Sequence, residues 1–595
     1  MDVAEAMLAD LAAERHPADG GGSCWMVPEK SDLRCSAGGR GKWHIVYEVG
    51  PRGVAQGGAI FLHIPPFWGW TSPQAVDPRE LGWVKVTVDA DAKWESTTVD
   101  QQLLMVKLTD GGLQEGDRIE FVYHGRADKY AESKAAFWMS VDGDGDGIRK
   151  LVDKRTNMDV EVMGGRPTSV HLNIASTAEP GSVLRLRFAF LDWGGNLALG
   201  NMDDFHFTFP SGAEPVGEPS FADGTGWLDL KLTEEGVHNI KLETPLGNFE
   251  SNPVVVRKNI ERVLWADLQV HTAISDGTGE LDQVYRYARE VAGLDAVCIT
   301  DHDHWGMKFL DQSPRVWKSL QDAAEEWNQH NDFTAFLGFE WTNWVYGHRH
   351  VIYGGSEGEL LSSIDPDYDT PQELWAALRG QNVLTVAHHS AGGAVATDWR
   401  IAPDPVLEPV TEIVSVHGSS EAFDSPGRIY SAKQNNFVRD ALGRGYRLGF
   451  MGSTDGHDGH PGLAHLAGAS GGVVAILSED NTRDAIMQAL RERRCFATNG
   501  PRILLRFELG QAKMGGTVPA GVENLTLTCR VVGTAPIERV DIIHGSEVVS
   551  SVAAGSKRVF FFSAEVPTMT AGEFVYLRVV QEDGGLAWSS PIWAE

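Results

Sequence analysis

The residues of this chain best suited to chemistry are histidines and carboxylates at the ends of short apolar runs. The first run, D-L-Q-V-H-T-A-I-S-D-G, covers residues 267–277, and later ones cover 296–303, 335–341, 347–353, 383–390, 412–418 and 448–457. Imidazole and carboxylate groups bind divalent metals, and a charged group at a buried strand end is costly without a counter-charge. Histidines and carboxylates that recur at the ends of these runs predict a metal site. A metal site with an accessible water is suited to hydrolysis.

Helix-like segments separate these runs. On a strand, residues i and i+2 share a face, so Asp267, Gln269 and His271 can point the same way. The helix-like segments cover residues 281–294, 313–328, 370–380, 431–443 and 481–494. Alternation of strand and helix is typical of an α/β fold with a parallel sheet, and closure of such a sheet into a barrel would gather about seven ligand-bearing strand ends at one mouth.

A chain of 595 residues is too long for one hydrophobic core, so we expect several domains. Residues 1–40 are rich in Gly, Ala and acids and predict a partly disordered lead-in. Residues 41–256 alternate apolar and polar positions between Gly, Pro and Asp turns, which predicts a β-sandwich region of one or two modules. Residues 257–500 form the α/β region, and residues 501–595 return to a period of two, which predicts a C-terminal β-sandwich.

The composition is 42% hydrophobic and 22% charged, with a formal net charge of −31. Such a surface repels phosphate backbones, so we expect neither a nucleic acid nor a membrane partner. The first residues carry acids where a signal peptide carries basic residues, and the five cysteines form no paired motif. These features predict a cytoplasmic protein that acts on a small molecule or carbohydrate; they specify no oligomeric state.

Residues 263–501 resemble the PHP (polymerase and histidinol phosphatase) superfamily of metal-dependent phosphoesterases, and within it the large DUF3604-type proteins with added β-domains. The resemblance implies a distorted TIM-like (β/α)7 barrel that holds two or three divalent ions, commonly manganese, zinc or iron. By the motifs D-L-Q-V-H-T, S-D-G, T-D-H, G-F-E, R-H-V-I-Y, A-H-H and T-D-G-H, the implied ligand positions are Gln269, His271, Asp276, His302, Glu340, His350, His388, Asp455 and His457.

Gln269 departs from the pattern, because the family's opening motif has a histidine there. An amide oxygen is a weaker ligand for borderline metals than an imidazole nitrogen, so an ion at that corner should bind weakly or not at all. Two other assignments stay open. His348 and His350 share a strand face, and His388 and His389 are adjacent, so either member of each pair fits.

The resemblance implies hydrolysis of a phosphodiester or phosphomonoester of a small organic or carbohydrate substrate by a metal-activated water. His417, Asp303, His389 and His460 are candidate general acids, or partners that orient a ligand imidazole. Candidate substrate-binding residues are Arg400, Lys433, Trp341 and Trp344. One alternative is a hydrolase of an ester, amide, sulfate or glycan bond on the same metal core. Another is an inert binding protein with a degenerate barrel.

A second cation signal lies in D-G-D-G-D-G, where Asp142, Asp144 and Asp146 take positions 1, 3 and 5 of an EF-hand-like loop and Asp153 takes position 12. Oxygen ligands at this spacing bind calcium. A solvated turn between two strands would show the same letters. The sequence therefore predicts either a structural calcium site or an ordinary Asp/Gly turn.

Overall fold

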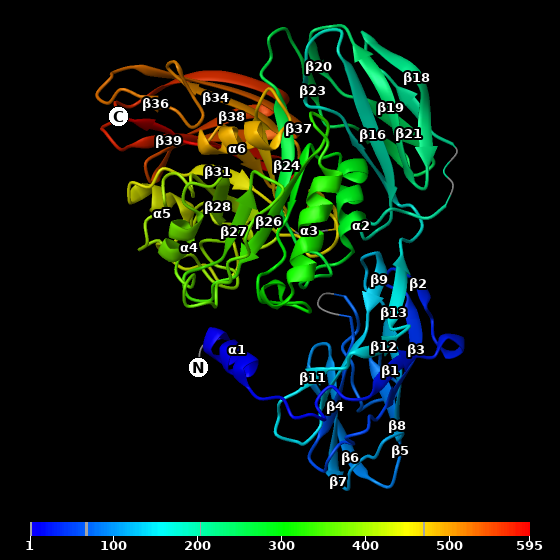
Figure 1. Ribbon diagram of the computed structural model, residues 1–595. Helices are drawn as coiled ribbons and strands as arrows, with labels where there is room; N and C mark the ends of the chain where they lie inside the picture. The colour runs from blue at the N-terminus through cyan, green and yellow to red at the C-terminus, as the bar shows by residue number, and fades with distance from the viewer. Residues whose placement is uncertain (1–2, 66–68, 201, 203, 468–469) are drawn as a thin grey trace. The chain divides into compact units, whose positions relative to one another are not determined.

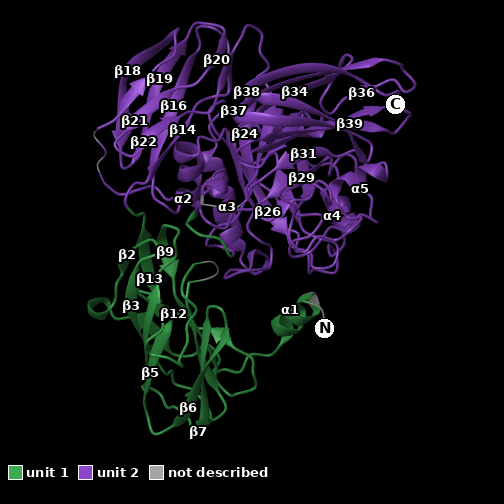
Figure 2. Ribbon diagram, turned by 180° about the vertical axis from the view of Figure 1, so that it is seen from behind, with its two compact units in different colours: residues 1–165, 276–280 green, residues 166–275, 281–595 purple. Residues whose placement is uncertain are grey.

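The computed structural model describes residues 3–65, 69–200, 202, 204–467 and 470–595. The chain forms two compact units. One contains Met1–Gly165 with Asp276–Glu280, and the other contains Arg166–Ser275 with Leu281–Glu595 (Figure 2). In the described residues, every helix is too short or too polar to cross a membrane.

The N-terminal unit is built from mostly antiparallel strands around an aromatic core, with β1–β12 and β2–β13 as parallel pairs. One sheet has the order β12-β1-β3-β8-β5 and a second the order β11-β10-β4-β7-β6, beside a small sheet β2-β13-β9. Trp43 packs against Tyr123 and Phe137 at ring-centre distances of 5.4 and 6.0 Å. The elements are α1 (Val3–Ala12), β1 (Ser23–Met26), β2 (Arg34–Ser36), β3 (Arg40–Glu48), β4 (Ala59–His63), β5 (Trp83–Asp89), β6 (Lys93–Asp100), β7 (Leu103–Asp110), β8 (Arg118–Arg126), β9 (Glu132–Ala136), β10 (Trp138–Asp142), β11 (Lys150–Leu151), β12 (Lys154–Thr156) and β13 (Asp159–Met163).

The second unit begins with another group of antiparallel strands. The sheet β14-β16-β19-β18 is accompanied by the smaller sheets β15-β23-β20 and β17-β21-β22. Phe188 and Phe190 on β16 belong to its apolar core. The strands are β14 (Ser169–Asn173), β15 (Thr177–Ala178), β16 (Val183–Leu191), β17 (His206–Thr208), β18 (Ala213–Ala222), β19 (Thr225–Leu232), β20 (Gly236–His238), β21 (Lys241–Thr244), β22 (Gly247–Glu250) and β23 (Val254–Val256).

A mixed sheet follows and carries the predicted metal ligands (Figure 1). Its strands are β24 (Val263–Val270), β25 (Ala296–Ile299), β26 (Thr334–Trp341), β27 (Arg349–Tyr353), β28 (Val383–Ala387), β29 (Val410–Ser415), β30 (Gly418–Ser419), β31 (Gly449–Gly452), β32 (Val473–Leu477) and β33 (Cys495–Thr498). Its helices are α2 (Leu281–Arg286), which continues as a π-helical turn over Tyr287–Val291, α3 (Pro314–Trp327), α4 (Pro371–Leu378), α5 (Val438–Gly443) and α6 (Arg483–Arg491).

The predicted (β/α)7 TIM-like barrel is wrong. The described residues are mostly strands in many sheets, and the central sheet is mixed. β27 pairs antiparallel with both β26 and β28, whereas β25–β26 and β28–β29 are parallel pairs. Only residues 342–348 join β26 to β27, whereas a parallel pair needs a crossover of about a dozen residues or more. The architecture is therefore β-rich and sandwich-like, with a few helices packed on the mixed sheet.

The last strands extend the same hydrogen-bonded sheet into the C-terminal region. β33 pairs with β40, so the mixed sheet and the final strands share a ladder. These strands are β34 (Leu504–Leu509), β35 (Ala512–Lys513), β36 (Thr517–Val518), β37 (Leu525–His544), β38 (Glu547–Val566), β39 (Phe574–Gln581), β40 (Leu586–Ser589) and β41 (Ile592–Ala594). The predicted four-part division of the chain stays a prediction.

A buried carboxylate ties the C-terminal strands to the loop after β30. Glu421, 0% exposed, accepts hydrogen bonds from Ser425, Arg439, Tyr576, Arg578 and Trp588 at 2.6, 3.0, 2.7, 2.9 and 2.9 Å. Burial raises the pKa of Glu421, but Arg578 and Arg439 outweigh it and bring the pKa to about 2. Glu421 is therefore ionised in the folded protein at neutral pH.

Replacing Glu421 by Gln should lower the free energy of unfolding by about 3–5 kcal/mol, because the buried Arg439 and Arg578 guanidinium groups lose the charge between them and keep only Asp424 and Asp541. In the wild-type protein, ionised Glu421 stabilises the folded state at pH values above 4.5, the ordinary pKa of glutamate. This stabilisation is lost as the pH falls towards 2, the pKa of Glu421 in the folded protein. Chemical denaturation between pH 3 and pH 7 measures both effects. Glu565→Gln, at an exposed position on β38, is the control. Equal stability of the Glu421→Gln variant and this control at pH 7 would contradict the role given to Glu421.

Candidate metal centre

Seven predicted ligands converge because they lie at or near one end of neighbouring strands of the mixed sheet. Glu340 on β26 pairs directly with His350 on β27, and isolated parallel bridges join His302 to Glu340 and Val270 to Gly456. The seven are His271 after β24, His302 after β25, Glu340, His350, His388 after β28, and Asp455 and His457 after β31.

Glu340 lies at the middle of this group. Its Oε1 is 2.8 Å from His348 Nδ1 and 3.2 Å from His302 Nδ1. Its Oε2 is 3.3 Å from His271 Nε2 and 3.5 Å from His388 Nε2. The carboxylate is 1% exposed. One buried carboxylate in contact with four imidazoles could help to hold a divalent ion.

Asp455 forms a second acidic corner. Its Oδ1 is 3.2 Å from His271 Nε2, and its Oδ2 is 2.9 Å from His417 Nε2 and 3.5 Å from His388 Nδ1. The backbone of Asp455 has a φ of +52°, a left-handed conformation that aspartate tolerates better than most residues. His271 and His388 therefore contact both carboxylates.

Three groups of ligand atoms that share no residue can be formed from these side chains. In each group, the ligand atoms lie within 4.8 Å of one another. The groups are His271, His302 and His457; His350, His388 and Glu412; and His389, His417 and Asp455. His348, His388 and His389 form a further such group. Both members of each pair that the sequence left open, His348/His350 and His388/His389, thus lie at the centre. Two or three ions have enough donors here.

His350 tests whether these residues suit a metal. It is fully buried, and neither ring nitrogen hydrogen-bonds to a described residue. Burial and the neighbouring His388 place the pKa of His350 well below its ordinary value, so its imidazole is neutral. A neutral imidazole with its nitrogens unpaired is the form that coordinates a divalent ion. The donor set therefore fits a metal.

The charges of the other ligands are strongly coupled. Burial raises the pKa of Glu340, but His302 and His388 outweigh it and hold the pKa well below the ordinary range. Burial and His302 lower the pKa of His271, yet hydrogen bonds to Asp455 and Glu340 raise it to about 9. Glu340 is therefore ionised, as a carboxylate metal ligand must be.

Glu412 is a candidate metal ligand that the sequence reasoning missed. It lies on β29, is 1% exposed, and joins His350 and His388 in one group of donor atoms. Burial raises its pKa to about 7. The signal was present in the run E-I-V-S-V-H-G, because an acid inside an otherwise apolar buried strand needs a partner.

Gln269 occupies the corner where the family pattern has histidine. Its amide nitrogen donates to Glu340 Oε2 at 3.0 Å and lies 3.0 Å from His388 Nδ1, while its oxygen accepts from Ser453 at 3.4 Å. The side chain is fully buried. It thus contacts two candidate ligands instead of supplying a ring nitrogen of its own.

Two further acids hold the loops that carry the ligands. Asp267, whose pKa burial raises to about 7, accepts from the Thr454 hydroxyl at 2.5 Å and from the Gly462 amide at 2.8 Å. Asp301 accepts from the Thr272 and Ser275 hydroxyls at 2.7 and 2.5 Å. Asp267 therefore positions the loop with Asp455 and His457, and Asp301 the loop after His271.

Asp276 is buried at 6% exposure and belongs to the segment Asp276–Glu280 of the N-terminal unit. Its role as a metal ligand stays a prediction.

The four predicted proton donors have different surroundings. His417 contacts Asp455 and keeps 22% side-chain exposure, and His389 stacks edge-on against His348 and His417 at 5.0 and 5.2 Å. Asp303 is fully buried, 2.8 Å from His304 Nδ1, and accepts from the Ser363 amide at 2.6 Å. His460 contacts Asn196 at 3.1 Å and the Tyr287 ring at 4.7 Å. Their catalytic roles stay predictions.

The predicted substrate-binding residues also differ. Trp344 is half-buried and donates to His304 Nε2 at 3.0 Å, with its ring 5.5 Å from His348. Trp341 is fully buried and donates to the Tyr368 carbonyl at 3.0 Å, which leaves no exposed face for a substrate. Arg400 is 87% exposed and paired with Asp398 at 2.7 Å, and Lys433 is exposed.

In the N-terminal unit, the loop predicted to bind calcium is closed by its own backbone. Asp142 accepts from the Gly145 and Gly147 amides at 2.7 and 3.0 Å, and Asp146 accepts from Ile148 at 2.7 Å. Asp153 is 82% exposed and 3.6 Å from Lys150. One ligand atom of Asp144 lies within 4.8 Å of those of His16 and Asp19. Calcium binding stays a prediction.

Comparison with known proteins gives a partial family match. The family described as "Protein of unknown function (DUF3604)" matches residues 295–425 and 462–514. This is the DUF3604 type that the motifs resemble, and it contains the Glu340, His350 and His388 positions.

Similar proteins in other organisms carry no described activity. An uncharacterized protein of Chlamydia pneumoniae is 23% identical over 512 residues, which cover 79% of this chain and 80% of that protein. One of Chlamydia trachomatis is 23% identical over 508 residues, with the same coverages of 79% and 80%. A crystal structure of a two-domain protein from Bacteroides vulgatus, described as containing a predicted PHP-like metal-dependent phosphoesterase, is 14% identical and covers 56% of this chain and 95% of its own, with a TM-score of 0.31. That score is too low to establish a shared fold.

Gln269→His should raise the number of bound divalent ions by about one per chain, because an imidazole nitrogen is a better ligand for borderline metals than an amide. Elemental analysis after dialysis against manganese or zinc measures the stoichiometry. Gln488→His, which adds a histidine on the exposed face of α6, is the matched control. An unchanged count in the Gln269→His variant would mean that this corner holds no ion even with the family's residue.

Proposed function

We propose that this protein is a metal-dependent hydrolase and that its substrate is a phosphoester. The observation that carries the proposal is the contact of the buried Glu340 carboxylate with four histidines from separate segments of the mixed sheet. A purely structural role would not need so many imidazoles around one acid, whereas a centre of two or three ions requires them.

Divalent ions bound here would lower the pKa of water and neutralise charge on the oxygens of a phosphate group. The chain itself supplies the positioning. Glu340 orients His302 and His348 through their Nδ1 atoms, and Asp455 orients His417 through Nε2. Asp303 contacts His304 Nδ1, and the Trp344 N–H fixes the other ring nitrogen of that histidine.

A phosphoester is favoured over other bonds by two arguments. The ligand motifs resemble those of metal-dependent phosphoesterases, and a cluster of ions is the means by which a chain of net charge −31 can hold an anionic group among carboxylates. Arg349, although on β27, is fully buried and paired with Glu408 at 2.9 Å, so it does not reach a substrate. Trp344 and Trp305, whose rings meet at 5.0 Å, offer aromatic surface to an organic or carbohydrate group.

We expect the purified protein, supplied with manganese or zinc, to hydrolyse aryl phosphate mono- or diesters. Glu340→Gln should lower kcat/KM by roughly 10³-fold, equivalent to about 4 kcal/mol of transition-state stabilisation. Glu326→Gln, on the exposed face of α3, should leave the rate unchanged. With nitrophenyl phosphate esters as substrates, the release of nitrophenol at a saturating metal concentration measures the rate.

The outcomes separate the alternatives. Stoichiometric metal with intact phosphoesters, but with Glu340-dependent cleavage of an ester, amide, sulfate or glycan, would replace the phosphoesterase by another hydrolase. Stoichiometric metal without cleavage of any of these substrates would favour a binding protein.

A further inference from the structure

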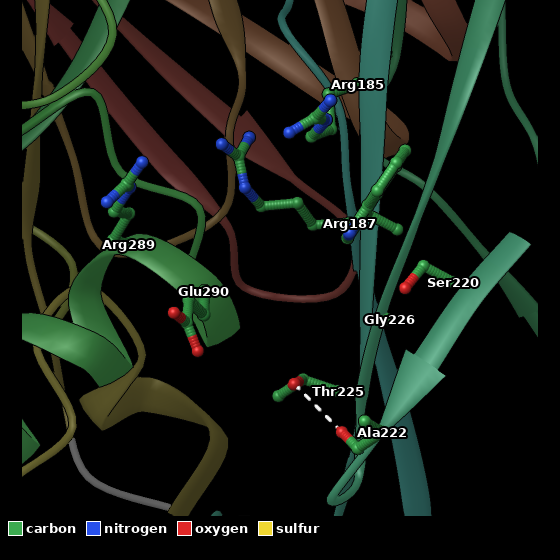
Figure 3. Close-up of a pocket in the computed structure, with 9 residues that line it drawn as sticks. Arg185, Arg187, Ser220, Ala222, Thr225, Gly226, Arg289 and Glu290 are labelled. Carbon is green, nitrogen blue, oxygen red and sulfur yellow. Dashed lines mark hydrogen bonds between the residues drawn. The ribbon is translucent and has the colours of Figure 1, made fainter.

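An arginine-lined pocket lies in the second unit, where β16, β18 and β19 face the π-helical turn after α2 (Figure 3). Its volume is 310 Å³. The residues that matter here are Arg185 and Arg187 on β16, Trp227 on β19, and Arg289 and Glu290 on the π-helical turn. None of these residues is a candidate metal ligand, so the pocket is separate from the metal centre in its chemistry.

Two of the three arginines are already neutralised. Arg185 forms a two-point ion pair with Asp229 at 2.9 and 3.0 Å, and its guanidinium lies 4.1 Å from the centre of the Trp227 ring. Arg289 binds Asp332 and Gln329, each at 2.8 Å. Their orientations are thus fixed by protein partners.

Arg187 differs from both neighbours. Its guanidinium forms no hydrogen bond or ion pair with any residue that the structure describes, and it extends from β16 into the space between Arg185 and Arg289 (Figure 3). Burial lowers the pKa of Arg187, Asp332 and Asp295 partly offset that effect, and Arg185 and Arg289 lower the pKa further. An incompletely solvated guanidinium with its donors unused is costly unless a ligand accepts from it.

Arg187 carries the charge that this pocket can offer to a ligand. Asp229 and Asp332 offset Arg185 and Arg289, which leaves Arg187 and Glu290 as the other charged residues of the lining. A guanidinium presents a planar fork of N–H donors that matches the oxygens of phosphate, sulfate or carboxylate. Trp227, 38% exposed, adds a flat apolar surface beside that fork.

We propose that this pocket binds an oxyanion and that Arg187 is its principal ligand. The shared chemistry is a phosphate, sulfate or carboxylate group, either free or attached to a small sugar. Arg185 and Arg289 are held by Asp229 and Asp332, so the charge offered to the anion is that of Arg187. The part of the Trp227 ring that Arg185 leaves exposed is available to a sugar that carries the anion. The inference does not depend on the proposed hydrolase activity.

Isothermal titration of the full-length protein with inorganic phosphate, inorganic sulfate and glucose 6-phosphate tests the proposal, with neutral glucose as the reference. All titrations use the Glu340→Gln background after treatment with chelator, so that the metal centre contributes no anion binding. We expect saturable binding that Arg187→Gln weakens by about 10- to 100-fold, as for the loss of charge-assisted hydrogen bonds. Arg257→Gln removes the same charge at an exposed position of the same unit and should leave the affinity unchanged.

Arg187→Lys retains the charge but lacks the planar fork, and we expect an intermediate affinity. It also serves if Arg187→Gln fails to fold, which circular dichroism would reveal. Equal affinity for phosphate and glucose 6-phosphate would identify the oxyanion alone as the ligand, whereas tighter binding of glucose 6-phosphate would add the sugar. The proposal is overturned if no anion binds, or if Arg187→Lys and, where it folds, Arg187→Gln bind as tightly as Arg257→Gln.

Discussion

The rest of the candidate site depends on one constraint: a carboxylate, Glu340, is kept ionised at 1% exposure. A buried charge of this kind is stable only when opposite charges or donors surround it. Four histidines contact it, and Gln269 adds a fifth donor. Those five residues come from β24, β25, β27 and β28 or from the loops beside them. Keeping Glu340 ionised therefore requires a donor side chain at this end of each of these strands.

The same logic extends outward from the centre. Asp267 and Asp301 are buried acids that form no ion pair with any residue the structure describes, and they accept hydrogen bonds from hydroxyl and amide groups of the ligand loops. Farther away, Glu421 is neutralised by two arginines and anchors the C-terminal strands. Gln269 is the exception, since a neutral amide replaces the expected imidazole at the centre itself. The ion count is therefore the property in which this chain should differ most from a complete site.

Much of the site could be predicted from the sequence, because each ligand ends or interrupts a short apolar run. The resemblance of these runs to a family implied His271, His302, Glu340, His350 and His388 as ligands, and the structure brings these five side chains close together. The helices at 314–327 and 371–378 fall inside the predicted segments. The barrel could not be predicted correctly, since alternation alone does not reveal that residues 342–348 are too few for a parallel crossover. Glu412 was missed because its run was judged by its terminal histidine. Trp341 was assigned to substrate because an aromatic next to a ligand looks the same whether it faces a cleft or the core.

The most direct test of the account is anomalous X-ray diffraction from crystals of the protein soaked with manganese or zinc and measured at the metal absorption edge. The account predicts at least two anomalous peaks, each within about 2.0–2.3 Å of donor atoms of the histidines and carboxylates around Glu340. Crystals with full metal exposure and no anomalous peak beside Glu340, or with peaks only at surface carboxylates, would contradict it.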